Sequence, residues 1–211
     1  MSRESHGRNP RRAPAPIVAD RLVAAVAGVA LLVSLYLAIT KFLAAAALFC
    51  ERGGGCDIVQ SSRWATFFGV PTAAWGVVLY AGLVAIALAG FTARRWLGAF
   101  LLAVVAVAFS GYLTWVELGV LHAVCPYCIV VALAALVLLI LLVVRRPHAV
   151  TNRAWGAPVR LAAMAVVTAA AIVVFSAAAF QVDTTFMASS AQQALAQHLT
   201  ASGAIFYGVF W

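Results

Sequence analysis

Four cysteines in two close pairs are the residues of this chain best suited to chemistry. Cys50 and Cys56 are separated by five residues, three of them consecutive glycines, and Cys125 and Cys128 form a Cys-x-x-Cys motif. Because Pro126 follows Cys125, and proline is favoured at the first helical position, we expect Cys125 to cap a helix. Unpaired N–H groups at a helix N-terminus lower the pKa of a thiol, so this pair is a candidate for reversible thiol–disulfide exchange.

The glycine-rich loop between Cys50 and Cys56 imposes little backbone restriction. It can close a disulfide ring, or bring one of its cysteines to another partner. Outside the cytoplasm disulfides persist, so the two pairs together predict a relay in which the loop pair passes electrons to the helix-end pair. Two structural disulfides are the alternative. A zinc site is disfavoured, because zinc-binding cysteine pairs have short spacings and one pair here has five intervening residues.

The composition predicts that membrane helices hold these cysteines. Of the 211 residues, 65% are hydrophobic and 9% are charged, and the mean hydropathy is +1.04. A soluble domain has about 45–50% apolar and about 25% charged residues, so an ordinary soluble enzyme is excluded, as is a disordered chain. Five stretches without Asp, Glu, Lys or Arg are long enough to span a bilayer: residues 22–40, 64–93, 96–116, 118–144 and 161–182.

The distribution of Lys and Arg predicts how these spans are oriented. Most of the 14 basic residues lie in the N-terminal tail and in two of the loops: Arg3, Arg8, Arg11, Arg12, Arg21, Arg94, Arg95, Arg145, Arg146, Arg153 and Arg160. By the positive-inside rule this side is cytoplasmic. The N-terminus is then cytoplasmic, whereas both cysteine pairs and the C-terminus are extracytoplasmic. The net charge of +8 is explained by topology, which argues against a nucleic-acid partner.

Three further features lie near the cysteines. Residues 57–68 mix polar and aromatic side chains and predict one short amphipathic helix at the interface, which either covers a ligand pocket or only anchors the chain. Cys128 is expected just inside the bundle, where a hydrophobic quinone can reach it. Glu117 either marks the outer end of its helix or accepts a proton. The spans carry no charges between their ends, which argues against a transporter.

These motifs resemble the bacterial members of the vitamin K epoxide reductase family. The resemblance covers roughly residues 22–144 and adds three segments to the cysteine pairs: Ser61-Ser62-Arg63-Trp64, Phe68-Gly69-Val70-Pro71 and Tyr112-Leu113-Thr114-Trp115. It implies an all-α membrane protein with a four-transmembrane-helix bundle around a quinone, plus a fifth transmembrane helix.

The resemblance also implies a role for each cysteine. Cys128 is similar to the cysteine that faces the quinone, and Cys125 to its disulfide partner, which exchanges with Cys56. Cys50 is similar to the cysteine that meets a thioredoxin-like partner. The implied quinone pocket contains Ser62, Phe68, Phe109, Tyr112, Ala132 and Cys128.

Two departures from the vertebrate members concern the acceptor. Ala132 stands where they carry a tyrosine, and Thr72 is the residue nearest to the position of an asparagine. Those two polar groups hold the vitamin K head group, so their absence favours a simple quinone over vitamin K epoxide.

Bacterial members often carry an extracytoplasmic thioredoxin-like domain after the fifth helix. Residues 188–200 are typical of a polar helix and 204–211 of a strand, which fits the first part of such a domain in truncated form. The expected organisation is a basic cytoplasmic tail (1–20), the catalytic four-helix bundle (21–146), a cytoplasmic loop with the fifth helix (147–182), and a linker with the start of the thioredoxin-like domain (183–211).

The sequence therefore predicts an oxidoreductase of a bacterial inner (plasma) membrane. It is expected to reduce ubiquinone or menaquinone to quinol, to need no metal, and to pass oxidising equivalents to a fused or separate thioredoxin-like partner for disulfide formation. The alternative is a non-enzymatic membrane anchor or scaffold with structural disulfides.

Overall fold

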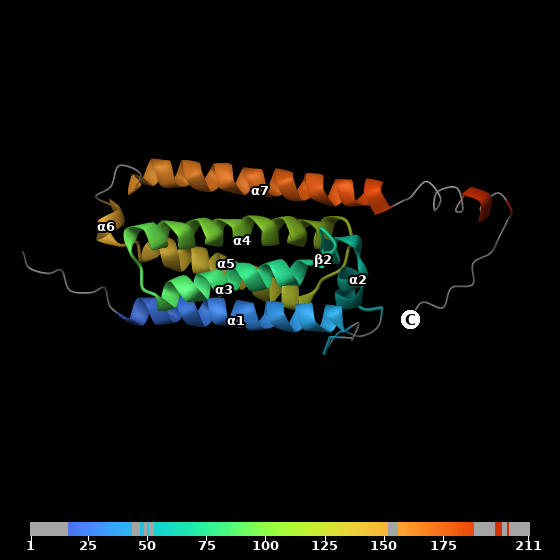
Figure 1. The fold of residues 1–211 in the computed structure, drawn as a ribbon, viewed down its shortest axis with the longest axis horizontal. Helices are drawn as coiled ribbons and strands as arrows, with labels where there is room; N and C mark the ends of the chain where they lie inside the picture. The colour runs from blue at the N-terminus through green and yellow to red at the C-terminus, as the bar shows by residue number, and fades with distance from the viewer. Residues whose placement is uncertain are drawn as a thin grey trace, which may run out of the picture.

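The described part of the chain is a set of long helices along one common axis (Figure 1). The computed structural model of the 211-residue chain describes residues 17–43, 47–48, 50, 53–151, 156–187, 197–199 and 202. The predicted strand at 204–211 and most of the basic tail lie outside these residues. Of the predicted helix at 188–200, only 197–199 are described, and they are helical.

Successive long helices run in opposite directions, and short elements occupy the two ends of the bundle (Figure 1). The long helices are α1 (Ile17–Phe42), α3 (Thr72–Leu88), α4 (Ala93–Gly119), α5 (Pro126–Val144) and α7 (Pro158–Met187). One end holds α2 (Gly55–Ser61), the 3-10 helix η1 (Arg63–Ala65) and the hairpin strands β1 (Thr66–Phe67) and β2 (Val70–Pro71); α6 (His148–Thr151) lies at the other. Helix α1 packs on α3 and α5, whereas α4 packs on α5 and α7.

Within the described residues, 4 helices are long and apolar enough to cross a membrane: Arg21–Phe42, Ala93–Gly119, Pro126–Val144 and Pro158–Gln181. The prediction of an all-α membrane protein is confirmed. Helix α3 is also apolar, but its 17 residues make it about 26 Å long, shorter than a hydrocarbon core of about 30 Å. It is shorter than the predicted stretch because the helix begins only after Pro71. A fifth span stays a prediction.

Small residues and one buried indole hold the helices together. A Cβ added at Gly76 of α3 would lie 3.0 Å from the Ser34 hydroxyl of α1, a close approach of the kind that small residues allow between membrane helices. Trp96 is buried and its Nε1 donates to the Leu142 carbonyl at 3.2 Å. That hydrogen bond joins α4 to α5 at the end of the bundle opposite the cysteines.

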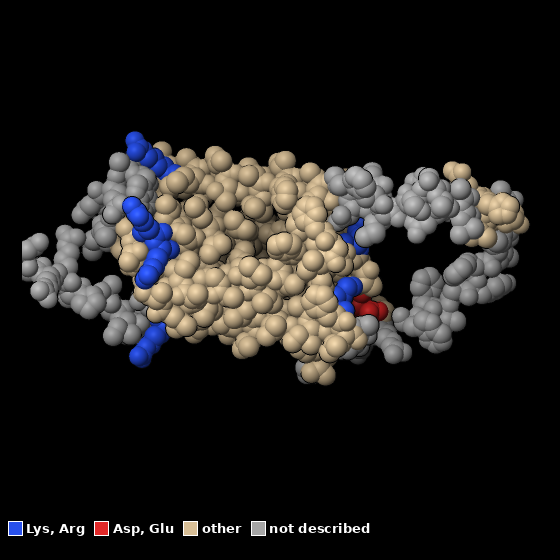
Figure 2. Space-filling model, in the orientation of Figure 1, with Lys and Arg blue, Asp and Glu red and all other residues tan. Residues whose placement is uncertain are grey.

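Charged side chains gather at the two ends and leave an apolar belt between them (Figure 2). One end carries Arg21, Arg94, Arg95, Arg145, Arg146 and Arg160. The end with α2 carries Lys41, Asp57 and Arg63. Large apolar side chains are exposed along the belt, among them Leu32, Val78 and Val166. The belt is the surface expected against lipid tails.

Candidate functional site

The outer cysteine pair is a disulfide between the loop after α1 and the first turn of α2. The Cα atoms of Cys50 and Cys56 are 5.4 Å apart. Cys56 is buried against Ala123 and Cys125, whereas Cys50 is half-buried. The outer pair therefore has one sulfur near the surface and one inside.

Two glycines of the loop have a specific steric role. Gly53 adopts a φ of +76°, a conformation that other residues rarely adopt, and its N–H donates to the Asp57 carboxylate at 2.9 Å. A Cβ at Gly55 would lie 2.7 Å from the Val124 carbonyl oxygen. Gly55 thus allows α2 to approach the segment immediately before Cys125. The glycines of this loop therefore matter for their small size as well as for their backbone freedom.

The loop is also tied to the neighbouring helices through two tyrosines. Tyr127, which lies between the cysteines of the Cys-x-x-Cys motif, donates its hydroxyl hydrogen to the Leu48 carbonyl. The Leu48 N–H donates to the Tyr36 hydroxyl of α1, and the two tyrosine rings are 5.7 Å apart. These contacts fix the chain close to Cys50.

The inner pair lies at the start of α5, as predicted. Cys125 is the N-cap, with φ −101° and ψ 112°, and Pro126 begins the helix. Cys125 and Cys128 are free thiols. The Cys125 side chain is 0% exposed, and its Sγ lies 3.9 Å from Cys56 Sγ. Because a disulfide bond is about 2.05 Å long, exchange between these two sulfurs requires a displacement of only about 2 Å.

The pKa of the Cys125 thiol is lowered from 9.0 to about 7. The largest cause is a hydrogen bond from the Cys128 thiol, and the backbone N–H groups of Cys128 and Tyr127 act in the same direction. Burial and the charge of Glu117 act against the shift. Since the thiolate is the reactive form, a large fraction of Cys125 is reactive near neutral pH.

A cavity of about 610 Å³ lies beneath the hairpin, between α1, α3, α4, α5 and α7. Cys128 lines this cavity, and the other three cysteines do not. Its wall is almost entirely apolar and rich in aromatic side chains: Trp64, Phe67, Phe68, Trp75, Tyr80, Phe109 and Phe175. The volume is within the range of small-molecule sites, about 300–1,000 Å³, and the apolar wall suits a hydrophobic quinone.

The buried polar side chains also line this cavity. Among the described residues three polar or charged side chains are buried, Ser34, Glu117 and Ser176, and all three line the cavity. Glu117 Oε2 accepts from the Cys125 N–H at 3.4 Å, whereas Oε1 has no hydrogen-bond partner. Sequence reasoning missed the two serines, because a serine within a long apolar run gives no indication of the direction in which it faces.

Four of the six predicted pocket residues line the cavity: Ser62, Phe68, Phe109 and Cys128. Tyr112 and Ala132 are not among the lining residues. Tyr112 instead stacks on Phe180 of α7, with ring centroids 6.0 Å apart. On α5 the lining residues are Cys128 and Val131. Thr72 does line the cavity.

The prediction of one amphipathic helix over residues 57–68 is wrong. Helix α2 ends at Ser61, and Ser62 has an extended backbone with φ −69° and ψ 160°. The hydroxyls of Ser61 and Ser62 each donate at 2.7 Å, to the carbonyls of Asp57 and Val59 respectively. Such side-chain bonds to the backbone compete with helix propagation.

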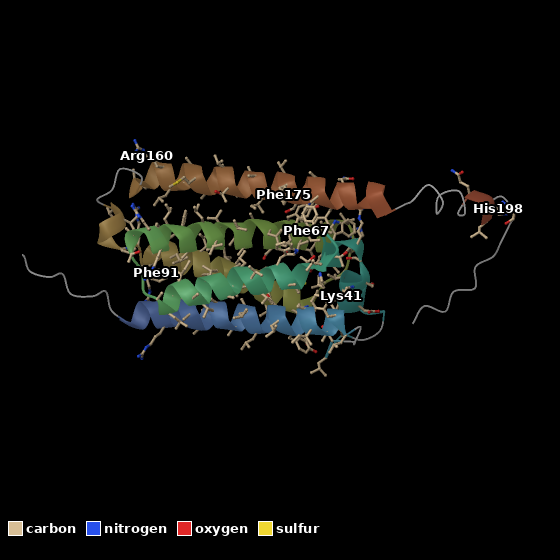
Figure 3. The ribbon with its side chains drawn as sticks, viewed as in Figure 1. Lys41, Phe67, Phe91, Arg160, Phe175 and His198 are labelled. Carbon is tan, nitrogen blue, oxygen red and sulfur yellow. A yellow bond between two sulfur atoms is a disulfide. The ribbon has the colours of Figure 1, made fainter. Side chains whose placement is uncertain are left out.

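The chain then forms a hairpin that covers the cavity. Phe68 and Gly69 both have positive φ, 53° and 73°, as a two-residue type I′ turn requires. The Phe67 ring lies 5.1 Å from Phe180 and 6.1 Å from Phe175 of α7. Figure 3 shows Phe67 and Phe175 side by side. The hairpin is therefore held against α7 by aromatic contacts, above a cavity that Phe67, Phe68 and Phe175 all line.

The fold and the site define a class of protein, a membrane helix bundle that holds two adjacent cysteine pairs beside an apolar cavity. The sequence model of the Vitamin K epoxide reductase family matches residues 21–143, a range that contains both cysteine pairs, α2 to α4, and all but the ends of α1 and α5. The chain belongs to the vitamin K epoxide reductase family. It is therefore an oxidoreductase, of a family that couples thiol–disulfide chemistry to a membrane quinone.

Helix α7 lies beyond the matched range, although Ile172, Phe175 and Ser176 of this helix line the cavity. Within the described residues, no group of three or more His, Cys, Asp or Glu is placed to hold a metal ion.

Proposed function

We propose that this protein is a quinone-dependent oxidase of protein thiols, with ubiquinone or menaquinone as the electron acceptor and a thioredoxin-like protein or domain as the electron donor. The distance of 3.9 Å between Cys56 Sγ and Cys125 Sγ is the observation that carries the proposal. It brings the two pairs within reach of exchange, while Cys128 is the cysteine at the cavity. Purely structural disulfides would not require this contact.

The first half of the cycle oxidises the partner. One partner thiolate attacks Cys50 Sγ, breaks the Cys50–Cys56 bond and releases Cys56 as a thiolate. The second partner thiol then attacks the partner–Cys50 disulfide, so that the partner leaves oxidised and Cys50 is reduced. Two electrons now reside on Cys50 and Cys56.

The second half moves these electrons to the acceptor. The Cys56 thiolate attacks Cys125 in the Cys125–Cys128 disulfide, and Cys50 then attacks Cys56, which restores the outer disulfide and leaves the inner pair as a dithiol. The inner dithiol reforms its disulfide and gives two electrons and two protons to the quinone, which becomes quinol. An outer disulfide with free inner thiols, as seen here, is the state immediately before quinone reduction.

We further infer that the arginine-rich end faces the cytoplasm and that the cysteine end faces outward, in the plasma membrane of a bacterium. This orientation follows the positive-inside rule and places the disulfides in an oxidising compartment. In this arrangement residues 21–146 are the catalytic bundle, and residues 183–211 are an extracytoplasmic linker with the start of a thioredoxin-like domain.

The relay is tested by trapping the exchange between the two pairs. The Cys50→Ala/Cys128→Ala variant retains only Cys56 and Cys125, and mild oxidation is expected to join them completely, as seen by mass spectrometry. The matched control, Cys50→Ala/Cys125→Ala, retains Cys56 and Cys128 and is expected to stay reduced. An absence of the Cys56–Cys125 disulfide would contradict the relay.

The acceptor is tested with the purified protein, a reduced thioredoxin-like protein and a soluble quinone analogue. Quinol formation, followed by ultraviolet absorbance, is expected in the wild type and lost in Cys128→Ala. Equal rates in the two proteins would show that Cys128 does not reduce the quinone.

A further inference from the structure

We propose that Glu117 is a catalytic acid–base group, which takes the proton of the Cys128 thiol and delivers it to an oxygen of the quinone. This inference rests on the proposed function and adds a proton path to it. Quinol formation needs two protons as well as two electrons. The wall of the cavity must therefore contain a group that moves protons where water is scarce.

The position of Glu117 meets this requirement. Its side chain is 4% exposed and lies in the last turn of α4, next to the N-terminus of α5. One carboxylate oxygen accepts from the Cys125 N–H at 3.4 Å, which fixes the group relative to the inner pair. Cys128 lies three residues further along α5, and both Glu117 and Cys128 line the cavity.

The second carboxylate oxygen is left for a ligand. Glu117 Oε1 is buried without a hydrogen-bond partner, and an unpaired buried oxygen of a carboxyl group is costly unless something else binds it. The protonated carboxyl can donate to a quinone oxygen, and the ionised form can accept the thiol proton.

The other ionisable side chains on the cavity wall are engaged with the backbone. Lys41 Nζ donates to the Gln60 carbonyl at 2.5 Å, and the Tyr80 hydroxyl donates to the Val131 carbonyl at 3.5 Å. The ionisable residues that line the cavity are Lys41, Tyr80, Glu117 and Cys128. Among these described groups, Glu117 alone combines an unpaired buried oxygen with a hydrogen bond to the inner cysteine pair.

The step balances without a further reactant. The Cys125 and Cys128 sulfurs lose two electrons as the bond between them forms, and the quinone gains them. One proton of the quinol is the Cys128 proton carried by Glu117. The other is taken up from water and balances the proton that Cys125 releases to water when it becomes a thiolate. Glu117 ends the step in the ionisation state in which it began.

The decisive variant is Glu117→Gln, because the amide oxygen still accepts from the Cys125 N–H but cannot take up and release a proton. Without quinone, the rate at which the reduced partner reduces the Cys125–Cys128 disulfide is not expected to fall, because loss of the Glu117 charge favours the Cys125 thiolate. With quinone, quinol formation is expected to fall about 100-fold or more, and Glu117→Asp is expected to recover part of it. Leu118→Gln, an exposed neighbour outside the cavity wall, is the matched control and is expected to behave as the wild type.

The outcomes separate the hypotheses. If the wild type makes no quinol, the proposed function fails. If the wild type does so and Glu117→Gln matches it, only the role of Glu117 is overturned. Equal slowing of both steps would overturn it too, since it would mean that the carboxylate only holds the start of α5.

A second measurement needs no quinone. In a Cys50→Ala/Cys56→Ala background, oxidation of the inner pair removes the Cys128 thiol, whose proton Glu117 is proposed to take. Infrared difference spectra are expected to show a change in a carboxyl band, which Glu117→Gln abolishes. A spectrum without a carboxyl change would overturn the proposal.

Discussion

At the scale of single residues, the inner cysteines differ in what surrounds them although they are three positions apart. Cys125 is buried beside Cys56 and receives hydrogen bonds at the helix N-terminus. Cys128 lines the cavity, as does Glu117. In the proposed cycle, the Cys125 sulfur exchanges with the outer disulfide and the Cys128 sulfur reduces the quinone. The Cys-x-x-Cys spacing puts them on either side of the first turn of α5.

The lowered pKa of Cys125 predicts a pH dependence. Because the pKa is about 7 rather than 9.0, the thiolate forms as the pH rises through 7 and is lost below it. In Cys128→Ala the largest cause of the shift is removed, so the pKa should rise toward 9.0, and the thiolate fraction at pH 7 should fall from about half to about one per cent.

Ultraviolet absorbance of the thiolate during a pH titration measures this directly, because the disulfide-bonded outer cysteines do not titrate. The pKa in Tyr127→Phe, which keeps the backbone N–H of that residue, serves as the comparison and should stay near 7. The hydrogen bond would be ruled out as the cause if Cys128→Ala titrated like the wild type.

At the scale of elements, α2 determines whether the two pairs meet. It is only 7 residues long and is positioned by its contact with Val124. A Cβ at Gly55 would collide with the Val124 backbone, so Gly55→Ala should displace α2 and separate Cys56 from Cys125. Since a misplacement of about 1 Å can slow a reaction about 100-fold, we expect disulfide formation between Cys56 and Cys125 to be slowed about tenfold to 100-fold.

The rate is measured in the Cys50→Ala/Cys128→Ala background by timed oxidation and mass spectrometry. Gly111→Ala is the matched control, because its Cβ on α4 would meet nothing within 4 Å. Formation of the disulfide at the same rate in both variants would mean that the α2 contact does not control exchange.

The same elements show which parts of the site can be predicted from sequence. The cap at Cys125 follows from the proline after it, because that local preference agrees with the final fold. The hairpin was missed because Phe68 adopts a φ of 53°, and a bulky residue gives no signal of a left-handed conformation. The burial of Glu117 and Ser176 depends on how α4 and α7 are rotated against their neighbours, which is decided by packing.

At the scale of the whole molecule, the separation of charges predicts the topology. Alkaline phosphatase is active only outside the cytoplasm, so a fusion at Thr92, between α3 and α4, should be inactive. A fusion at Ala123, between α4 and α5, should be active. Fluorescent-protein fusions at the same two sites should give the opposite pattern. Active phosphatase at Thr92 would contradict the proposed orientation.

The burial of Cys56 and Cys125 also affects which thiols can donate electrons to the enzyme. These two cysteines are buried, whereas Cys50 and Cys128 are half-buried, and Cys128 is the cysteine that lines the cavity. A small water-soluble thiol that reacts with Cys50 therefore does not come into direct contact with an acceptor in the cavity. In the proposed relay, electrons cross from the aqueous side to the lipid side through a single buried pair of sulfur atoms. This route would limit electron transfer from unintended donors, and selection among thiols would take place at Cys50.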